Sequence, residues 1–123
     1  MPDSQAIERW LDAYEASWSS GSDVRELFTL DALYFNAPYR PPLVGLAAIE
    51  AWWIEQGESD TRWAFERRVI ATEGDLHVVQ GTTTYPDSPG LAGQPQIYYN
   101  LWLVTLAHDG RAREFVEYWM LPE

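Results

Sequence analysis

The sequence predicts an α+β fold in which N-terminal helices pack on one side of a curved antiparallel sheet. Two observations lead to this fold class. Apolar residues recur at helical spacing over much of the chain up to Gly57, and from about Arg62 onward they alternate as they do in strands. The second half divides into two runs, each split by an acidic residue and a glycine, which is the pattern of a hairpin.

The first two segments are expected to be helices. Apolar residues from Ile7 to Trp18 recur on one helix face, and Ser4 can cap the free amide groups at the start. A short second helix is expected within residues 22–32, because Asp23 and Glu26 have the spacing of a capping box.

A brief strand from Leu33 to Asn36 is expected next, followed by a turn that three prolines stiffen in "YFNAPYRPP". A third helix is expected in "GLAAIEAWWIEQG", between two glycines. Four long antiparallel strands complete the chain. Residues 86–95, rich in proline and glycine, join the two hairpins and would act as a lid or as a plain connector.

Length, charge and composition limit the possible functions. The 123 residues are enough for one domain, 1–123, and too few for two. A formal charge of -11 disfavours binding to nucleic acid or to an anionic membrane surface. The chain has no cysteine, no apolar run long enough to span a membrane, and an acidic start unlike a signal peptide. We therefore expect a cytoplasmic protein without cofactor or metal.

Two stretches resemble a known superfamily. "LFTLDALYFNAPYRPPLVGLAAIEAWW" and "DGRAREFVEYWM" are similar to the short helix, strand, turn, third helix and last strand of the nuclear transport factor two and SnoaL-like polyketide cyclase superfamily. The resemblance implies a cone-like fold and supports a ligand cavity and a homodimer formed through the sheet. This scaffold hosts isomerases, cyclases, hydrolases, dehydratases and non-catalytic modules, so the resemblance implies the fold better than the activity.

The last hairpin predicts which side chains share a face. A turn at Asp109 and Gly110 pairs Val104 with Phe115, Trp102 with Glu117, and Asn100 with Trp119. The opposite face is more apolar, and we expect it to form the homodimer interface through Leu101, Leu103, Val116, Tyr118 and Met120.

In the first hairpin, a turn at "EG" would put three residues of its first strand, Glu66, Arg68 and Ile70, on one face with His77, Val79, Gly81, Thr83 and Tyr85. Glu66 beside Arg67 and Arg68 is expected to form a surface ion pair. The two histidines have no second ligand at metal spacing; His108 is expected to face solvent at its turn, and His77 to lie at the open end of the sheet.

Glu117 is the candidate catalytic residue. Its aromatic neighbours predict a partly buried carboxyl with a raised pKa, whereas the alternative is a solvated carboxylate at the sheet end. Aromatic walls with a few polar groups suit a small hydrophobic molecule. The ligand-binding candidates are Tyr14, Trp18, Tyr34, Asn36, Thr83, Tyr85, Asn100, Trp102, Phe115 and Trp119.

Several of these aromatic and polar residues have a second interpretation. Asn36 can instead satisfy the backbone where the strand enters the proline turn. Tyr34 and Tyr39 are either cavity donors or edge aromatics that cover the helix ends. Core packing is the expected role of three further tryptophans, Trp10, Trp53 and Trp63.

In the limonene-epoxide-hydrolase branch of the superfamily, a Tyr-x-Asn motif holds the catalytic water, and Tyr34 and Asn36 match it. Glu117 aligns with the last-strand aspartate of that branch. Its Arg-x-Asp pair, however, falls on Gly81 and Thr83, so that activity is not expected. Two hypotheses remain: a binder of a small hydrophobic molecule that acts as an isomerase, cyclase or dehydratase through Glu117, or a non-catalytic binding or dimeric assembly module.

Overall fold

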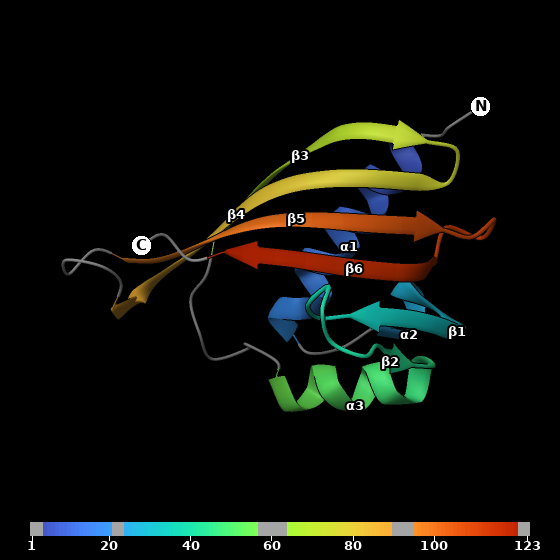
Figure 1. The fold of residues 1–123 in the computed structure, drawn as a ribbon, viewed down its shortest axis with the longest axis horizontal. Helices are drawn as coiled ribbons and strands as arrows, with labels where there is room; N and C mark the ends of the chain where they lie inside the picture. The colour runs from blue at the N-terminus through green and yellow to red at the C-terminus, as the bar shows by residue number, and fades with distance from the viewer. Residues whose placement is uncertain (1–3, 21–23, 57–63, 90–94, 121–123) are drawn as a thin grey trace.

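The computed structural model describes residues 4–20, 24–56, 64–89 and 95–120 (Figure 1). The three helices are α1 Ser4–Ser20, α2 Val24–Leu27 and α3 Leu46–Gln56. The six strands are β1 Phe28–Phe35, β2 Leu43–Val44, β3 Ala64–Glu73, β4 Leu76–Pro89, β5 Pro95–Leu106 and β6 Ala112–Met120. The α+β plan and the change from helix to strand after the third helix are therefore confirmed.

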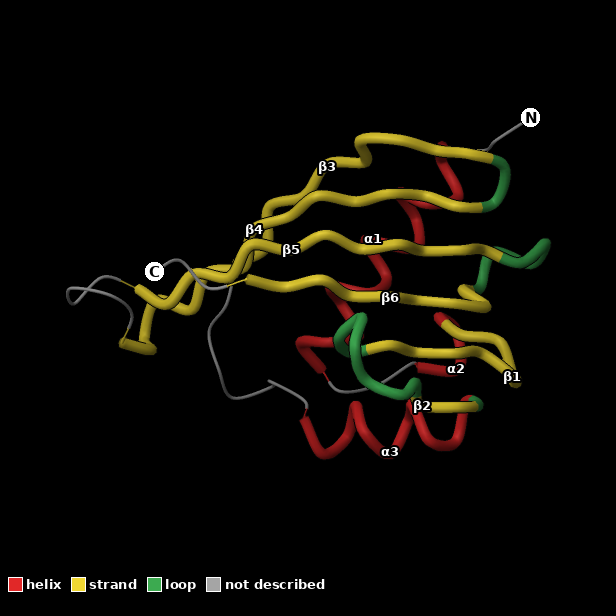
Figure 2. Tube along the Cα trace, viewed as in Figure 1, coloured by secondary structure: helices red, strands yellow, loops and turns green. Residues whose placement is uncertain are grey.

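The six strands form one curved, open sheet in the order β2-β1-β6-β5-β4-β3. Figure 2 shows α1 crossing behind the sheet, with α2 and α3 beside β1 and β2. We call the face toward α1 the inner face and the opposite one the outer face. Strands β3 to β6 pair antiparallel as expected, but β1 runs parallel to β6. The sheet is therefore mixed.

The first strand begins earlier than the sequence predicts. The short helix ends at Leu27 and β1 starts at Phe28, five residues before the expected start at Leu33. The reason is tertiary: Phe28 pairs with Ala112 of the last strand, and this contact outweighs the local helix signal of the capping-box spacing. The strand β2 has only two residues, too few to show the alternation by which a strand is predicted from sequence. Gly45, directly after β2, takes a φ of 90°, which glycine adopts without strain.

The register of the second hairpin is confirmed. Trp102 lies opposite Glu117, and the same register pairs Val104 with Phe115 and Asn100 with Trp119. Near the turn a bulge shifts the pairing, so that Leu106 faces Ala112. The bulge does not change which side chains share the inner face further along β5 and β6.

The register of the first hairpin was predicted incorrectly. Its turn lies one residue later, so that Glu73 pairs with Leu76, and a bulge follows between Val69 and Ala71. As a result Arg67, rather than Glu66 or Arg68, pairs with Gly81. The residues of β3 on the inner face are Phe65, Arg67 and Val69.

The core lies between α1, α3 and the inner face. Trp10 and Trp53 are buried, as expected, and Trp10 Nε1 donates to the Leu27 carbonyl at 2.8 Å. This bond ties α1 to the end of α2. The expectation for Trp63 lies outside the described residues.

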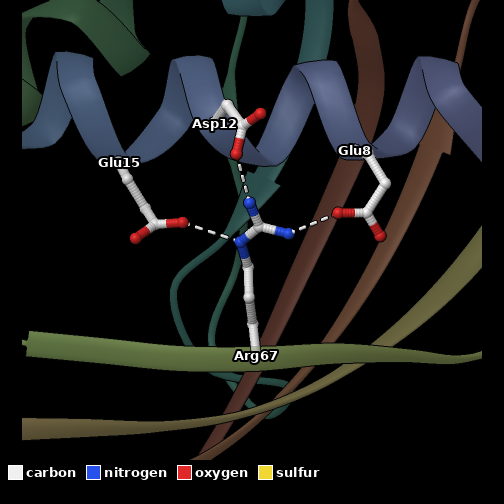
Figure 3. A network of polar contacts seen from close by, with 4 residues as sticks. All are labelled: Glu8, Asp12, Glu15 and Arg67. Atoms are coloured by element: carbon white, nitrogen blue, oxygen red, sulfur yellow. Dashed lines mark hydrogen bonds and ion pairs between the residues drawn. The ribbon is translucent and has the colours of Figure 1, made fainter.

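Arg67 fastens α1 to β3 through three carboxylates (Figure 3). Its Nε and Nη1 donate to Glu15 and Glu8, both at 2.7 Å, and Nη2 contacts Asp12. Glu8, Asp12 and Glu15 follow one another at helical spacing along one side of α1. Burial alone lowers the pKa of Arg67, but the hydrogen bonds to Glu15 and Glu8 outweigh it and raise the pKa. Arg67 therefore links the helix to the sheet instead of forming the expected surface ion pair with Glu66.

Strands β4 and β5 extend beyond their neighbours as a two-stranded arm, seen on the left of Figure 1. The last residue of β6, Met120, pairs with Tyr99, so β5 has no β6 partner from Pro95 to Tyr98. Much of the segment expected to be a lid or connector belongs to these strands, and residues 90–94 lie outside the described ranges. No helix among the described residues is long and apolar enough to cross a membrane.

Candidate functional site

Aromatic side chains from α1 and three strands pack around one tyrosine on the inner face. Tyr14 of α1 lies with its ring centre 4.6 Å from that of Trp102 and 5.9 Å from that of Phe115. On β1, Tyr34 stacks on Phe115 at 4.7 Å. Both tyrosines are buried, and so are Trp102 and Phe115. These four predicted site residues are therefore brought together.

Glu117 stands beside this cluster and accepts two hydrogen bonds on one oxygen. Asn100 Nδ2 donates to Oε2 at 2.9 Å and Trp102 Nε1 donates to the same atom at 3.2 Å. The side chain is half-buried. The two donors stabilise the ionised carboxylate, in opposition to its partial burial, so the raised pKa expected from the sequence stays a prediction.

Thr83 fixes the orientation of Asn100. Its Oγ1 donates to Asn100 Oδ1 at 2.8 Å, and both residues are buried. Because a carboxylate can only accept, the Asn100 amide must turn its nitrogen toward Glu117 and its oxygen toward Thr83. Thr83, Asn100 and Glu117 thus form a directed chain of hydrogen bonds across β4, β5 and β6.

The two buried tyrosines are held in their neutral form. Burial raises the pKa of Tyr14, and the nearby charges of Tyr34 and Glu117 raise it further. Burial likewise raises the pKa of Tyr34, followed by the charge of Glu117, while a hydrogen bond with Tyr14 acts in the opposite direction. At neutral pH each hydroxyl keeps its proton, as a hydrogen-bond donor beside a carboxylate must.

The remaining aromatic candidates lie near the arm and at the end of α1. Trp119 is 38% exposed and packs edge-on against Tyr98 at 5.8 Å, and Tyr98 packs in the same way against Tyr85. Trp18 stacks on Tyr14 at 6.2 Å. The predicted site residues therefore form two groups. One is buried around Tyr14, and the other is more exposed and consists of Tyr85 and Trp119, which both contact Tyr98 near the arm.

The buried Asn36 Oδ1 finds no hydrogen-bond partner in the described part of the chain. Asn36 directly follows Phe35, whose partner on β6 is Val116, the residue before Glu117. A buried acceptor without a donor costs free energy unless water or a ligand supplies one. Asn36 was expected either to bind the ligand or to satisfy the backbone at the proline turn. No backbone hydrogen bond to its Oδ1 occurs among the described residues, so the second role has no support through this atom.

Neither histidine forms a catalytic pair with Glu117 in the described structure. His108 is exposed at its turn, as expected. His77 lies near the turn of the first hairpin, where it is only 3% exposed, and Thr72 Oγ1 lies 2.9 Å from its Nδ1. Burial lowers its pKa, with Asp75 acting in the other direction. No group of three or more potential metal ligands occurs among the described residues.

Sequence reasoning missed Phe65 and Tyr98. Phe65 stacks on Trp102 at 4.9 Å, and it was missed because the first hairpin was assigned the wrong register. Tyr98 could have been found, since it alternates with Asn100 and Trp102 along the same strand.

The outer face carries a separate open groove of about 1020 Å³. Its lining includes Tyr39, Tyr99, Leu101, Tyr118 and Met120. Tyr39 is 74% exposed there and lies beneath the Arg40 guanidinium, so it is neither a donor on the inner face nor a cover for a helix end. The stretch "YFNAPYRPP", residues 34–42, is thus divided between the two faces of the sheet.

Comparison with solved structures places this arrangement in a known fold. The enzyme SalBIII, described as epoxide hydrolase/cyclase-like and active in pyran ring formation in the polyether salinomycin, shares 18% identity at a TM-score of 0.73, over 98% of this chain and 95% of that one. A SnoaL-like polyketide cyclase from Jannaschia sp. CCS1 shares 23% identity at a TM-score of 0.71, over 95% and 86%. A ketosteroid isomerase-like protein from Erwinia carotovora atroseptica SCRI1043 shares 21% at 0.65, over 96% of each chain.

At these identities the solved structures establish the fold alone. No curated protein sequence is similar enough to count as a match. The family model of the SnoaL-like domain, however, matches residues 7–115, which is most of the chain. The expected superfamily is confirmed, and the chain belongs to the SnoaL-like domain family.

Proposed function

We propose that the protein binds a small hydrophobic molecule against the inner face and moves a proton on it, with Glu117 as the general acid or base. The observation that carries the proposal is the pairing of an oriented carboxylate with two buried neutral tyrosines. Asn100 and Trp102 hold the carboxylate. The raised pKa values of Tyr14 and Tyr34 keep their hydroxyls protonated. Three of the family's structural neighbours are cyclase-like or isomerase-like proteins.

The chemistry follows from these groups. A carboxylate removes a proton next to a carbonyl, and the electron pair moves onto the carbonyl oxygen. A neutral tyrosine hydroxyl stabilises the enolate oxygen by donating a hydrogen bond. Where a double bond is conjugated with the enolate, the protonated Glu117 returns the proton at the far carbon of that system, which shifts the double bond and completes an isomerisation without a cofactor. In a cyclase the enolate carbon instead attacks a second carbonyl of the ligand, whose oxygen takes the proton from Glu117. In a dehydratase a β-hydroxyl takes that proton and leaves as water.

The unsatisfied oxygen of Asn36 favours a ligand that carries a hydrogen-bond donor. Its buried Oδ1 has no donor in the described residues, and its neighbour in the chain, Phe35, pairs beside Glu117. A hydroxyl or enol group on the ligand would supply that donor. Trp119 and Trp18, which are more exposed, offer ring faces for the hydrophobic part of the molecule.

Binding is tested with naphthol, a flat hydrophobic phenol that imitates an enol, and with naphthalene as the matched probe without a hydroxyl. Tryptophan fluorescence reports both. We expect naphthol to bind the wild type at least tenfold more tightly than naphthalene, about 1.4 kcal/mol, and to lose this advantage in Tyr14→Phe/Tyr34→Phe. Equal binding of the two probes to the wild type would contradict recognition by the hydroxyls.

We further propose that two copies pair through the outer face. Leu101, Leu103 and Val116 are only half-buried in one copy, and Met120 is 66% exposed. This apolar row is large for a surface left in water. Light scattering should give the dimer mass for the wild type and the monomer mass for Leu101→Glu. Leu30→Glu, a change at a residue 81% exposed on β1, should remain dimeric. A monomer mass for the wild type at micromolar concentration would contradict the proposal.

A further inference from the structure

We propose that Gly81 and Phe65 are positioning residues for Glu117 and that they act through the indole of Trp102. The inference rests on the proposed role of Glu117. Gly81 lies in the middle of β4, where a glycine normally weakens a strand. The backbone of Gly81 is not in the left-handed region, so its conformation does not require glycine.

The Phe65 ring explains the glycine. A Cβ added to Gly81 would lie 2.5 Å from Phe65 Cε1 and 2.6 Å from Phe65 Cζ. Both distances are far shorter than two carbon atoms allow. The edge of the Phe65 ring therefore occupies the space that a side chain at residue 81 would need.

The same ring also supports Trp102. The two rings stack at 4.9 Å with an angle of 20° between their planes. The ring centre of Tyr14 also lies 4.6 Å from that of Trp102, so two aromatic rings pack against the indole. Its Nε1 donates to Glu117 Oε2. The position of the Phe65 ring therefore fixes the direction in which the indole N–H points.

Two supports thus converge on Glu117 Oε2 from neighbouring strands. Thr83 orients Asn100, and Phe65 over Gly81 orients Trp102. A carboxylate held at one oxygen by two donors has a fixed plane, and proton transfer needs that fixed direction. An aromatic ring over a glycine also stabilises a sheet by packing alone. The test must therefore read the Trp102 N–H as well as stability.

The experiment follows the Trp102 indole N–H resonance by ¹H–¹⁵N NMR, assigned with Trp102→Phe. In the wild type this resonance should move on Glu117→Gln and should follow the titration of the carboxyl. In Phe65→Leu it should shift as for a lost hydrogen bond and no longer respond to Glu117→Gln. Gly81→Ala should reproduce that loss, and Gly81→Ala/Phe65→Leu should be more stable than Gly81→Ala because the clash is removed.

Leu43→Ala, a truncation on β2 at the far edge of the sheet, controls for general loss of packing. It should lower stability and leave the Trp102 resonance and its response to Glu117→Gln unchanged. The positioning role is overturned if Phe65→Leu behaves like Leu43→Ala. If Gly81→Ala does not fold, Phe65→Leu alone decides. A wild type that shows the Glu117 response but no turnover would contradict the proposed function and leave the positioning role intact.

Discussion

Asn100 donates its amide hydrogen to Glu117 Oε2 at 2.9 Å while its own oxygen accepts from Thr83. Because the Asn100 amide donates to Glu117, replacing it with a carboxylate places two negative charges together. In Asn100→Asp the donor becomes a second carboxylate beside Glu117, and two carboxylates at hydrogen-bond distance cannot both ionise without strong repulsion. One of them must then hold a proton.

We predict that Asn100→Asp loses about 2 kcal/mol or more of unfolding free energy at neutral pH and recovers most of it near pH 4. The pair binds its shared proton more tightly than the unfolded chain does, so the loss grows as the pH rises above about 4. Urea unfolding at several pH values measures it. Asn100→Ala should lose stability without this pH dependence, and parallel curves for the two variants would refute the assigned contact.

Arg67 is 15% exposed and neutralises part of the acidic side of α1. We predict that Arg67→Met lowers the unfolding free energy by about 1–3 kcal/mol, because it leaves Glu8, Asp12 and Glu15 to repel one another. Added salt should stabilise this variant and weaken the wild type, since it screens repulsion in one and attraction in the other. Arg68→Met, on the exposed neighbour, should change stability by about 0.5 kcal/mol or less. An identical salt response in both variants would count against the link.

The buried tyrosines predict an alkaline limit to stability. The pKa values of Tyr14 and Tyr34 are raised in the folded state, chiefly by burial. Above about pH 10 the unfolded chain releases protons that the folded chain keeps. The unfolding free energy should therefore fall by up to about 1.4 kcal/mol per pH unit for each tyrosine. Tyr14→Phe and Tyr34→Phe should each flatten this slope. An unchanged slope in both variants would show that these hydroxyls ionise freely.

Much of the fold could be predicted because it depends on local patterns. The helical spacing from Ile7 to Trp18 and the turn at Asp109 and Gly110 each lie within a short stretch of chain. The latter gave the pairing of Trp102 with Glu117. The early start of β1 could not be found in this way, because its partner on β6 is more than 80 residues away in the chain. Whether such a segment becomes helix or strand is decided by that pairing.

The candidate site was predictable where one hairpin carried it and not elsewhere. Asn100, Trp102 and Glu117 share a face by turn geometry alone. Phe65 and Arg67 were misplaced because the bulge between Val69 and Ala71 shifts the pairing by one residue, which reverses the face of every side chain of β3 beyond it. Which donors reach Glu117 depends on side-chain rotamers, and no spacing in the sequence encodes these.

The proposed proton transfer by Glu117 is measured with a cyclic β,γ-unsaturated ketone in D₂O, by following its isomerisation to the conjugated ketone and the deuterium taken up at the γ-carbon of that product. We expect the wild type to catalyse both, and Glu117→Gln to be slower by a factor of about 100 or more while binding naphthol within about tenfold of the wild type. Equal rates for the wild type and Glu117→Gln would show that Glu117 does not transfer the proton.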